Sequence, residues 1–354
     1  MTTRTIGTPF SRRELLAGMA LAGVWGGSAL AREDGSSRML DALVIGGGTA
    51  GLSAALHAAQ AGASVAIIEK GSRLGGTLWF SGGQLSGAGT ARAKRMGITD
   101  SPAMHLADVM RLGEFKADPA IVRLAVDNAA STIDWFDARG VEWRANHPVE
   151  ATGHEPYSAR RLFAPVRAGI ALLEELMAVL PTFTDSIDVH LDTEAHEIIV
   201  DASNVVRGVV ATDAAGVRRD FLARRVLLTS GGANGNEAVF AEFNSAPQYR
   251  TPWWPLNTGL GHRMAIEAGA VVRGQDAYLP DIGSVPASRA WPASSIASAI
   301  HHPQRRLPWE IYVNSGGARF MREDHMSIDY REKAVAAQLG HTYWSIFDAQ
   351  TLAS

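Results

Sequence analysis

Two short apolar runs near the start of the chain flank a glycine turn and a helical pattern. The first run, ALVI at residues 42–45, ends at a group of glycines, and the second run, VAII at residues 65–68, ends at Glu69. Small residues between the two runs repeat with the spacing of a helix. Runs that are apolar throughout are typical of strands buried on both faces of a parallel sheet. The pattern therefore predicts a strand, a turn, a helix and a second strand, which is a βαβ unit.

The turn of this unit carries Gly46, Gly48 and Gly51 in the order G-x-G-x-x-G. The first glycine allows a tight turn, the second lets the backbone approach a pyrophosphate, and the third lets the helix pack closely against the sheet. The N–H groups of the first helical turn supply partial positive charge, and Glu69 is placed to accept hydrogen bonds from a ribose. We therefore expect an adenine dinucleotide to bind here, and the motif alone leaves open which one.

The pattern further along the chain predicts an α/β fold with a second, antiparallel sheet. Helices are expected at 118–139, where Asp118-Pro119 provides an N-cap and a proline at the first position, and at 166–180. Residues 187–191, 197–200, 205–212 and 218–223 then alternate apolar and polar positions, as strands of a β-meander do. The run at 225–229 is expected to return to the parallel sheet, followed by a helix at 264–268 and a strand at 270–273.

A glycine-rich segment follows the second strand directly. Residues 71–89 contain seven glycines, including Gly75-Gly76-Thr77 and Ser81-Gly82-Gly83. Backbone without side chains can wrap closely around a ligand, so we interpret this segment as a second part of the dinucleotide site. The alternative is a mobile surface loop.

The composition of the chain changes at about Asp281. Proline, serine and tryptophan become common after this point, and the regular order of strands and helices is lost. We therefore place a domain boundary here, with a dinucleotide-binding domain at 32–280 and a second unit at 281–354.

Residues 1–31 are expected to be an export signal. The segment SRRELL contains Arg12 and Arg13, a weakly apolar stretch follows, and Ala29-Leu30-Ala31 is a cleavage site of the A-x-A type. This combination resembles a twin-arginine leader, and the apolar stretch is too short and glycine-rich for a stable membrane span. The sequence therefore predicts a periplasmic or otherwise exported protein that takes up its cofactor before export.

Charge and cysteine content exclude several classes of function. The formal net charge is −3, and without residues 1–31 the chain has 30 basic and 35 acidic residues, or −5, which argues against a nucleic-acid partner. There is no cysteine, so the chain has no disulfide, thiolate zinc site or iron–sulfur cluster of its own, and we expect no metal. Any electrons must come from, or go to, a separate donor or acceptor.

Six blocks of sequence together resemble the flavoprotein family of fumarate reductase and succinate dehydrogenase. The chain is most similar to the soluble branch that contains flavocytochrome c, urocanate reductase, tricarballylate dehydrogenase and 3-ketosteroid dehydrogenase. The blocks occur in the family's order. They are Val44–Gly51, Glu69-Lys70, the two glycine clusters of 71–89, Thr229–Gly232 with Asn236, Asn257–Gly261, and Tyr312–Asn314 with Gly317–Phe320.

The resemblance implies a Rossmann-like FAD-binding domain with a parallel sheet and a β-meander, plus a partial α+β capping domain at 281–354. It also implies that FAD is held without a covalent link, because no histidine occurs between His57 and His105, where membrane-bound members attach the flavin. The residues expected to contact FAD are Gly46, Gly48, Ala50, Gly51, Glu69, Lys70, Gly75, Gly76, Thr77, Ser81, Gly82, Gly83, Ala195, Thr229, Gly231 and Gly261.

The reaction implied by the resemblance moves hydride between flavin N5 and a carbon next to a carboxylate or carbonyl of a small-molecule substrate. Such chemistry needs cations and a positioned acid or base. Arg306 falls near the place of one family arginine, and Arg331 is a shifted candidate for the proton-donating arginine, whose gapless position is Ser327. His301 and His302 could form an acid/base pair, although paired loop histidines are more often solvated.

The chain ends at Ser354, inside the expected cap. Family members continue with a final glycine-rich block that covers the flavin, so we expect the sequence to be incomplete or truncated. Two alternatives therefore stay open beside the small-acid oxidoreductase: an enzyme like 3-ketosteroid Δ1-dehydrogenase, and a non-catalytic flavin-binding remnant.

Overall fold

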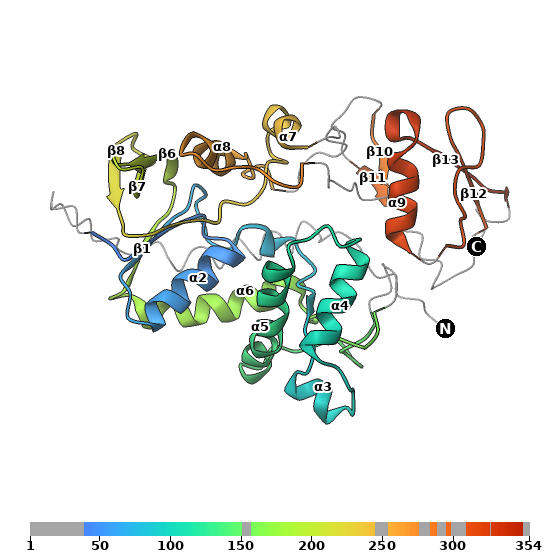
Figure 1. The fold of residues 1–354 in the computed structure, drawn as a ribbon, viewed down its shortest axis with the longest axis horizontal. Coiled ribbons are helices and arrows are strands. Elements are labelled where there is room, and N and C mark those ends of the chain that lie inside the picture. Colours follow the sequence, from blue (N-terminus) through green and yellow to red (C-terminus); the bar gives the residue numbers. More distant parts are fainter. Residues whose placement is uncertain are drawn as a thin grey trace.

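The computed structural model describes residues 39–150, 157–244, 254–275, 284–288, 295–298, 309–325 and 327–349. The predicted leader at 1–31 lies outside these residues. Figure 1 shows the parallel sheet near one end of the molecule and the elements β12, β13 and α9 at the opposite end. The α/β class with a parallel sheet and a β-meander is confirmed.

Four parallel strands form the central sheet in the order β5-β2-β1-β9. They are β5 (Ile187–His190), β2 (Val65–Ile68), β1 (Ala42–Ile45) and β9 (Val226–Leu228). The strands β1 and β2 are buried at every position, as their uninterrupted apolar runs predict. The assignment of 187–191 to the meander was wrong, because β5 pairs with β2 in the parallel sheet.

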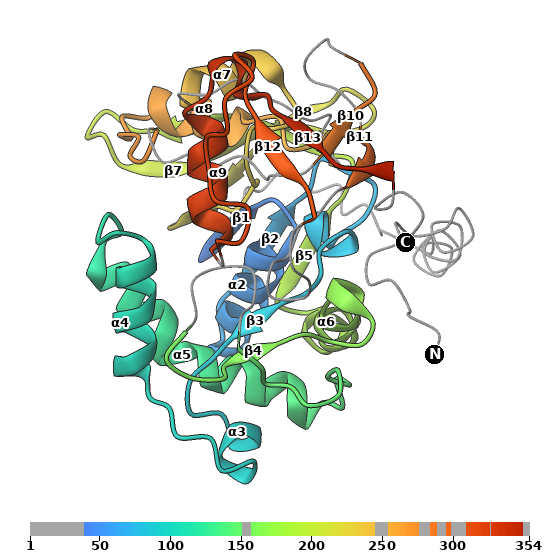
Figure 2. The same ribbon diagram turned by 90° about the vertical axis from the view of Figure 1, so that its right-hand side faces the viewer.

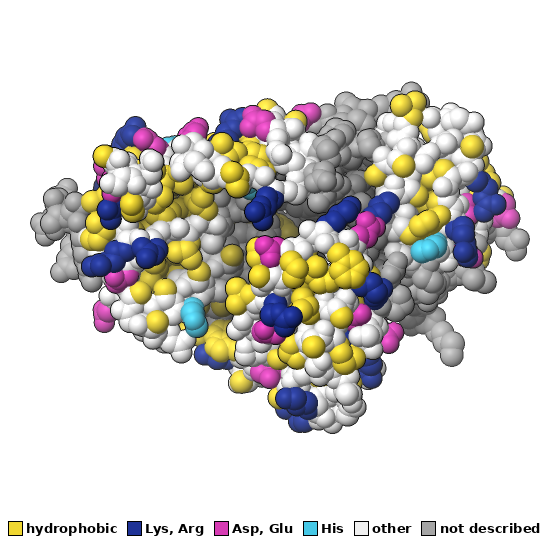
Figure 3. All heavy atoms as spheres, in the orientation of Figure 1, with side chains coloured by type: hydrophobic (Ala, Val, Ile, Leu, Met, Phe, Trp, Pro, Cys, Tyr) yellow, Lys and Arg dark blue, Asp and Glu magenta, His cyan; other side chains and the backbone are white. Residues whose placement is uncertain are grey.

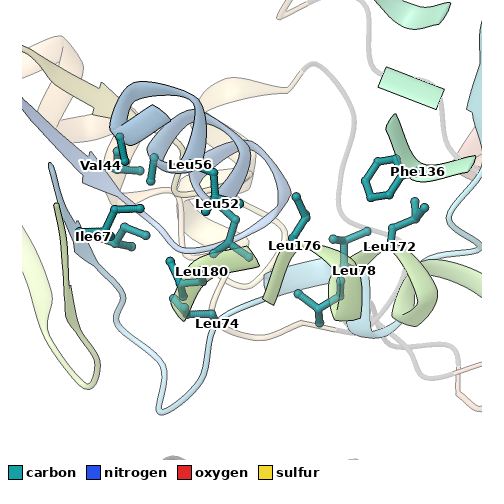
Figure 4. Packing of buried hydrophobic residues seen from close by; sticks show 14 of the residues in the cluster. Val44, Leu52, Leu56, Ile67, Leu74, Leu78, Phe136, Leu172, Leu176 and Leu180 are labelled. Carbon is teal, nitrogen blue, oxygen red and sulfur yellow. The ribbon is translucent and has the colours of Figure 1, made fainter. Parts of the chain in front are cut away.

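One face of this sheet is covered by helices. Helix α2 (Thr49–Gln60) and helix α6 (Ala168–Val179) lie against it, and α5 (Pro119–Ala138) extends the same core. Figure 4 shows Leu52 and Leu56 of α2 beside Val44 and Ile67, with the leucines of α6 continuing the cluster. Burying a leucine or isoleucine contributes about 1.5–3 kcal/mol, so this core fixes α2 against β1.

The β-meander covers the other face of the sheet. Its strands are β6 (Glu194–Val200), β7 (Val206–Thr212) and β8 (Arg218–Leu222), which pair in antiparallel order. Val209 and Ala211 pack on the sheet residues of that face, together with Met264 of α8 (Leu260–Glu267). The helix expected at 264–268 therefore begins four residues earlier. Residues 270–275 form no strand, contrary to the strand expected at 270–273.

A helical lobe, which we define as α3 (Ala91–Arg95), α4 (Pro102–Leu112) and α5, lies on one side of the sheet (Figures 1 and 2). The fully buried Arg161 joins it to the chain before β4 (Leu162–Phe163), which pairs with β3 (Leu85–Ser86). Its guanidinium donates to both carboxylate oxygens of Asp100 at 2.9 and 2.8 Å, and to Asp108 at 2.7 Å. A two-point contact between arginine and a carboxylate fixes the relative orientation of the two groups and also pairs their charges.

The remaining elements are the helices and strands of the second half of the chain and three short 3-10 turns. Helix α9 (Ile328–Ala336) packs with β12 (Ile311–Val313), which pairs with β13 (Trp344–Ile346). The others are β10 (Ser284–Pro286), β11 (Ser295–Ser298), α7 (Glu237–Phe243) and the 3-10 turns η2 (Gly76–Trp79), η3 (Leu180–Phe183) and η4 (Leu339–His341). No helix within the described ranges is long and apolar enough to cross a membrane.

Candidate functional site

A cavity of about 340 Å³ opens at the edge of the sheet where β1, β2 and β9 end. Its wall combines the glycine turn after β1, the first turn of α2, the end of β2, the start of the meander and the segment that leads into α8. Ligands of open α/β sheets bind in this position, outside the carboxyl ends of the strands. The lining residues are Ile45, Gly46, Gly48, Thr49, Ala50, Ile68, Glu69, Lys70, Gly76, Thr77, Thr193, Glu194, Ala195, Thr229, Ser230, Gly231, Gly232, Trp254, Leu256, Asn257, Thr258, Gly259, Leu260, Gly261 and Met264.

The glycine turn leaves no room for a side chain at the first and last glycines of the motif. Gly46 has a φ of +104°, and a Cβ on it would lie 2.7 Å from the carbonyl oxygen of Thr229. A Cβ on Gly51 would lie 1.9 Å from the carbonyl oxygen of Gly46. The Thr229 hydroxyl donates to the carbonyl oxygens of Ile45 and Gly46 at 2.9 and 2.8 Å, so β9 is tied to this turn. The backbone at this end of the cavity is therefore fixed.

Two helices begin at the cavity. Helix α2 follows Gly48, and α8 follows Gly259, whose φ is +73°; neither start is capped by a side chain. The first N–H groups of a helix have no partner within the helix and carry partial positive charge. Thr49, Ala50, Leu260 and Gly261 belong to these first turns and line the cavity. The site is therefore suited to an anionic ligand such as a pyrophosphate.

Glu69 closes the end of β2. Its carboxylate accepts hydrogen bonds from the backbone N–H groups of Gly47 at 2.8 Å and Gly71 at 2.7 Å, and the residue is 8% exposed. Each carboxylate oxygen keeps a further acceptor position. Glu69 therefore holds the turn in place and still has acceptor capacity toward the cavity that it lines, as the ribose prediction requires.

An ion pair lies next to Glu69 in the wall of the cavity. The Lys70 ammonium group is 2.7 Å from the Glu194 carboxylate, and both side chains are about one third exposed. This contact joins the end of β2 to the first residue of the meander. It also neutralises the Lys70 charge close to the part of the cavity formed by Ala195.

Most residues that the sequence assigned to the cofactor come together around this cavity. Those that line it are Gly46, Gly48, Ala50, Glu69, Lys70, Gly76, Thr77, Ala195, Thr229, Gly231 and Gly261.

Five of the assigned residues do not line the cavity: Gly51, Gly75, Ser81, Gly82 and Gly83. Gly51 and Gly83 are packing positions, since a Cβ on Gly83 would lie 2.7 Å from the backbone nitrogen of Gly169. A Cβ on Gly75 would meet the side chains of Leu173 and Trp79 at 2.6 Å, whereas Gly82 has only an ordinary contact at 3.8 Å. The glycine density of this loop therefore also serves close packing on α6.

Sequence reasoning missed the aromatic and apolar part of the wall. Trp254 lines the cavity and packs on Phe80, with 5.5 Å between the ring centroids. Leu256 lies so close to the loop that a Cβ on Gly71 would be 3.0 Å from its Cδ1 atom. No motif marks Trp254 or Leu256. The segment Asn257–Gly261 is one of the six blocks of the family resemblance, but only its last residue, Gly261, was predicted to contact FAD.

The catalytic candidates His301, His302 and Arg306 lie outside the described residues. Arg331 lies on α9 and is 1% exposed, and its Nε and Nη2 atoms have no hydrogen-bond partner among the described residues. Burial lowers the pKa of Arg331, while Tyr312, Tyr343 and nearby acids act in the opposite direction.

Tyr312 lies in the same interior. It is 1% exposed, and its hydroxyl donates to Glu310 at 2.8 Å. Burial, followed by that hydrogen bond, raises the pKa of Tyr312 above its usual range. Arg331 is thus a buried cation beside a neutral phenol, and two of its guanidinium nitrogens remain available for an anion.

Residues 41–344 match the family model described as the FAD binding domain, and the chain belongs to this family. A fumarate reductase (cytochrome) from Shewanella frigidimarina is 29% identical over 319 residues, covering 87% of this chain and 52% of that protein. A urocanate reductase from Eggerthella lenta is 31% identical over 213 residues, covering 60% and 34%. The chain thus spans about half the length, or less, of these curated relatives.

Solved structures share the fold. The open conformation of a flavocytochrome c3 fumarate reductase superposes with a TM-score of 0.69 at 21% identity, covering 99% of this chain and 58% of that one. A 3-ketosteroid-Δ4-(5α)-dehydrogenase from Rhodococcus jostii RHA1 gives a TM-score of 0.70 at 20% identity, covering 92% and 69%.

The residues at the cavity fit FAD, the cofactor of this family. Gly48 and Gly76 face one another so closely that a Cβ on Gly76 would lie 3.1 Å from the Gly48 Cα atom, which gives a cradle of bare backbone. Two uncapped helix starts supply N–H groups for a pyrophosphate, and Glu69 supplies acceptors for a ribose. No cluster of three metal-ligating side chains occurs in the part of the chain that the structure describes.

Proposed function

We propose that this chain is the FAD-binding part, with a portion of the substrate-capping part, of an oxidoreductase acting on a carbon–carbon bond next to a carboxylate or carbonyl. Membership of the FAD binding domain family supports this proposal, as do relatives named for the reduction of fumarate and urocanate. Bound FAD supplies the acceptor or donor of hydride. Residues 281–354 would form the portion of the cap.

We infer an acidic substrate from Arg331, whose buried guanidinium lacks hydrogen-bond partners at Nε and Nη2 within the described part of the chain. A buried polar group without a partner costs about 1–3 kcal/mol, and more when charged. A carboxylate accepting from Nε and Nη2 would offset this cost with the two-point geometry that arginine favours. In this role Arg331 orients an acidic substrate and stabilises the negative charge that develops beside the reacting carbon.

Arg331→Gln tests this role, with Arg319→Gln as the matched control. Arg319 lies in the same part of the chain, but its side chain is 60% exposed and paired with Glu323 at 2.6 Å. Binding of fumarate and urocanate to the FAD-loaded protein can be followed from the flavin absorbance, and turnover with a reduced viologen. We expect Arg331→Gln to weaken binding of both acids about 100-fold or more, corresponding to about 3 kcal/mol, and Arg319→Gln to change it little. Equal binding by the two variants would contradict this role.

A 3-ketosteroid dehydrogenase-like activity is the second candidate. Tyr343, whose ring centroid lies 5.1 Å from that of Tyr312, supports it, because a phenol can donate a hydrogen bond to a ketone, whereas the Tyr312 hydroxyl already donates to Glu310. Turnover of a 3-ketosteroid with no response to dicarboxylates would select this candidate. Stable flavin binding without turnover of either substrate would select the third, a non-catalytic flavin-binding remnant.

We also propose export by the twin-arginine route and non-covalent FAD. The paired Arg12 and Arg13 and the site after Ala31 support export, and the absence of histidine between His57 and His105 supports a non-covalent link. Since these 354 residues contain no cysteine, no iron–sulfur cluster or thioether-linked haem bound by them relays the electrons. Replacing both arginines by lysine should retain the flavin-loaded precursor in the cytoplasm. Unchanged appearance in the periplasm would contradict this route.

A further inference from the structure

An ion pair joins the cap portion to the helical lobe. Lys333 on α9 donates a hydrogen bond to the carboxylate of Glu114, a residue 219 positions earlier in the chain. Glu114 lies in the turn between α4 and α5. The contact therefore links the helix that carries Arg331 to the helical lobe, whose helix α5 shares a hydrophobic core with α2 and the parallel sheet.

The turn at Glu114 has an unusual and well-defined backbone. Glu114 and Phe115 both adopt left-handed conformations, with φ values of 51° and 58°. Two successive non-glycine residues in this region are rare, because each incurs a steric cost. Backbone hydrogen bonds from Phe115 to Met110 at 2.8 Å and from Lys116 to Gly113 at 3.0 Å hold the turn. The backbone that carries Glu114 is therefore held by hydrogen bonds within the turn.

Arg331 and Lys333 face opposite sides of α9. Residues two apart on an α-helix are separated by about 200° around its axis. Arg331 is accordingly buried in the interior that contains Tyr312, while the Lys333 side chain is 47% exposed and reaches Glu114. The Lys333–Glu114 contact therefore lies on the opposite side of α9 from the groups around Arg331.

We propose that Glu114 and Lys333 are positioning residues that hold α9, and with it Arg331, in place relative to the FAD-binding part. The inference rests on the proposed function in that Arg331 is the substrate cation. Exposed ion pairs add little to stability, and salt screens them. The expected effect is therefore a modest, salt-sensitive change in position and not unfolding.

The distance between α9 and the helical lobe tests the positioning directly. Because the sequence has no cysteine, Ala120→Cys on α5 and Ala337→Cys after α9 provide two unique sites for spin labels on exposed positions. In this labelled background we compare Lys333→Glu, Glu114→Lys and the double reversal at low salt. Lys333→Glu is the cleaner single change, because Glu114 also lies 3.4 Å from Lys116. Arg167→Glu, which breaks the exposed ion pair between Arg167, just before α6, and Glu174 on α6, is the matched control.

Each single reversal should broaden the distance distribution and shift it to longer values, the double reversal should restore it, and Arg167→Glu should leave it unchanged. About 0.5 M salt, which screens the ion pair, should shift the distances of the protein without a reversal in the same direction but by less. Apparent affinity for fumarate should fall about threefold in the single reversals and recover in the double reversal. Single reversals that leave the distances unchanged, or a double reversal that does not restore them, would overturn the inference. Distances that respond while substrate affinity does not would instead refute the proposed role of Arg331.

Discussion

Replacing Gly51 by alanine is predicted to force the start of α2 away from the glycine turn that precedes it. A Cβ at this position would lie 1.9 Å from the carbonyl oxygen of Gly46 and 2.8 Å from Thr229 Oγ1. Carbon and oxygen atoms normally stay about 3.3 Å apart or more, so the helix start and the turn must separate by roughly 1.4 Å. Overpacking costs about 1–3 kcal/mol, and we expect about 3 kcal/mol because backbone on both sides must move.

Thermal unfolding and FAD titration measure this effect. A loss of about 3 kcal/mol lowers Tm by roughly 6–12 °C in a domain of this size, and FAD affinity should fall about tenfold or more as the first turn of α2 shifts. Gly82→Ala is the control, because a Cβ on Gly82 has only an ordinary contact at 3.8 Å and Gly82 does not line the cavity. A Gly51→Ala variant that melts and binds FAD like the Gly82→Ala variant would refute the reasoning.

Two further predictions concern the helical lobe. Arg161→Met should destabilise the protein to urea by about 3–5 kcal/mol, because Asp100 and Asp108 lose their buried partner, whereas Arg167→Met should cost under about 1 kcal/mol; equal losses would contradict this. Burial, reinforced by the Arg161 charge, lowers the pKa of His105, so below about pH 6.5 the unfolded chain binds a proton at this residue more readily than the folded protein does. The contribution of His105 to the free energy of unfolding should therefore be fully present above that pH and be lost as the pH falls below it. His105→Leu should reduce the dependence of the free energy of unfolding on pH in this range, and an unchanged dependence would show that His105 does not contribute.

The sequence predicted those parts of the fold that depend on local pattern. Uninterrupted apolar runs identified β1 and β2, and Asp118-Pro119 marked the start of α5. The strand β5 was misassigned because its alternating pattern is that of a half-covered strand. It lies at the edge of the parallel sheet, where burial is incomplete. Helix α4 was missed, although Ser101-Pro102 is the same type of helix start as Asp118-Pro119.

The residues of the site also divide into those that the sequence identifies and those that only the structure shows. Positions where the backbone must approach a ligand or another chain segment need glycine, so Gly46, Gly48 and Gly76 could be found from the sequence alone. Trp254 could not, because its place in the wall depends on a contact with Phe80, far away in the sequence. The close packing of Gly83 on Gly169 is likewise a property of the assembled fold. Local geometry is thus readable in this chain, whereas long-range contacts require the structure.

FAD titration of the purified protein, followed by acid precipitation, tests the central claim most directly. We expect one FAD per chain, bound with its fluorescence changed and released intact by acid. We also expect no competition from NAD at comparable concentration. A protein that takes up no FAD, or that binds NAD at this cavity instead, would contradict the assignment of the cavity to FAD.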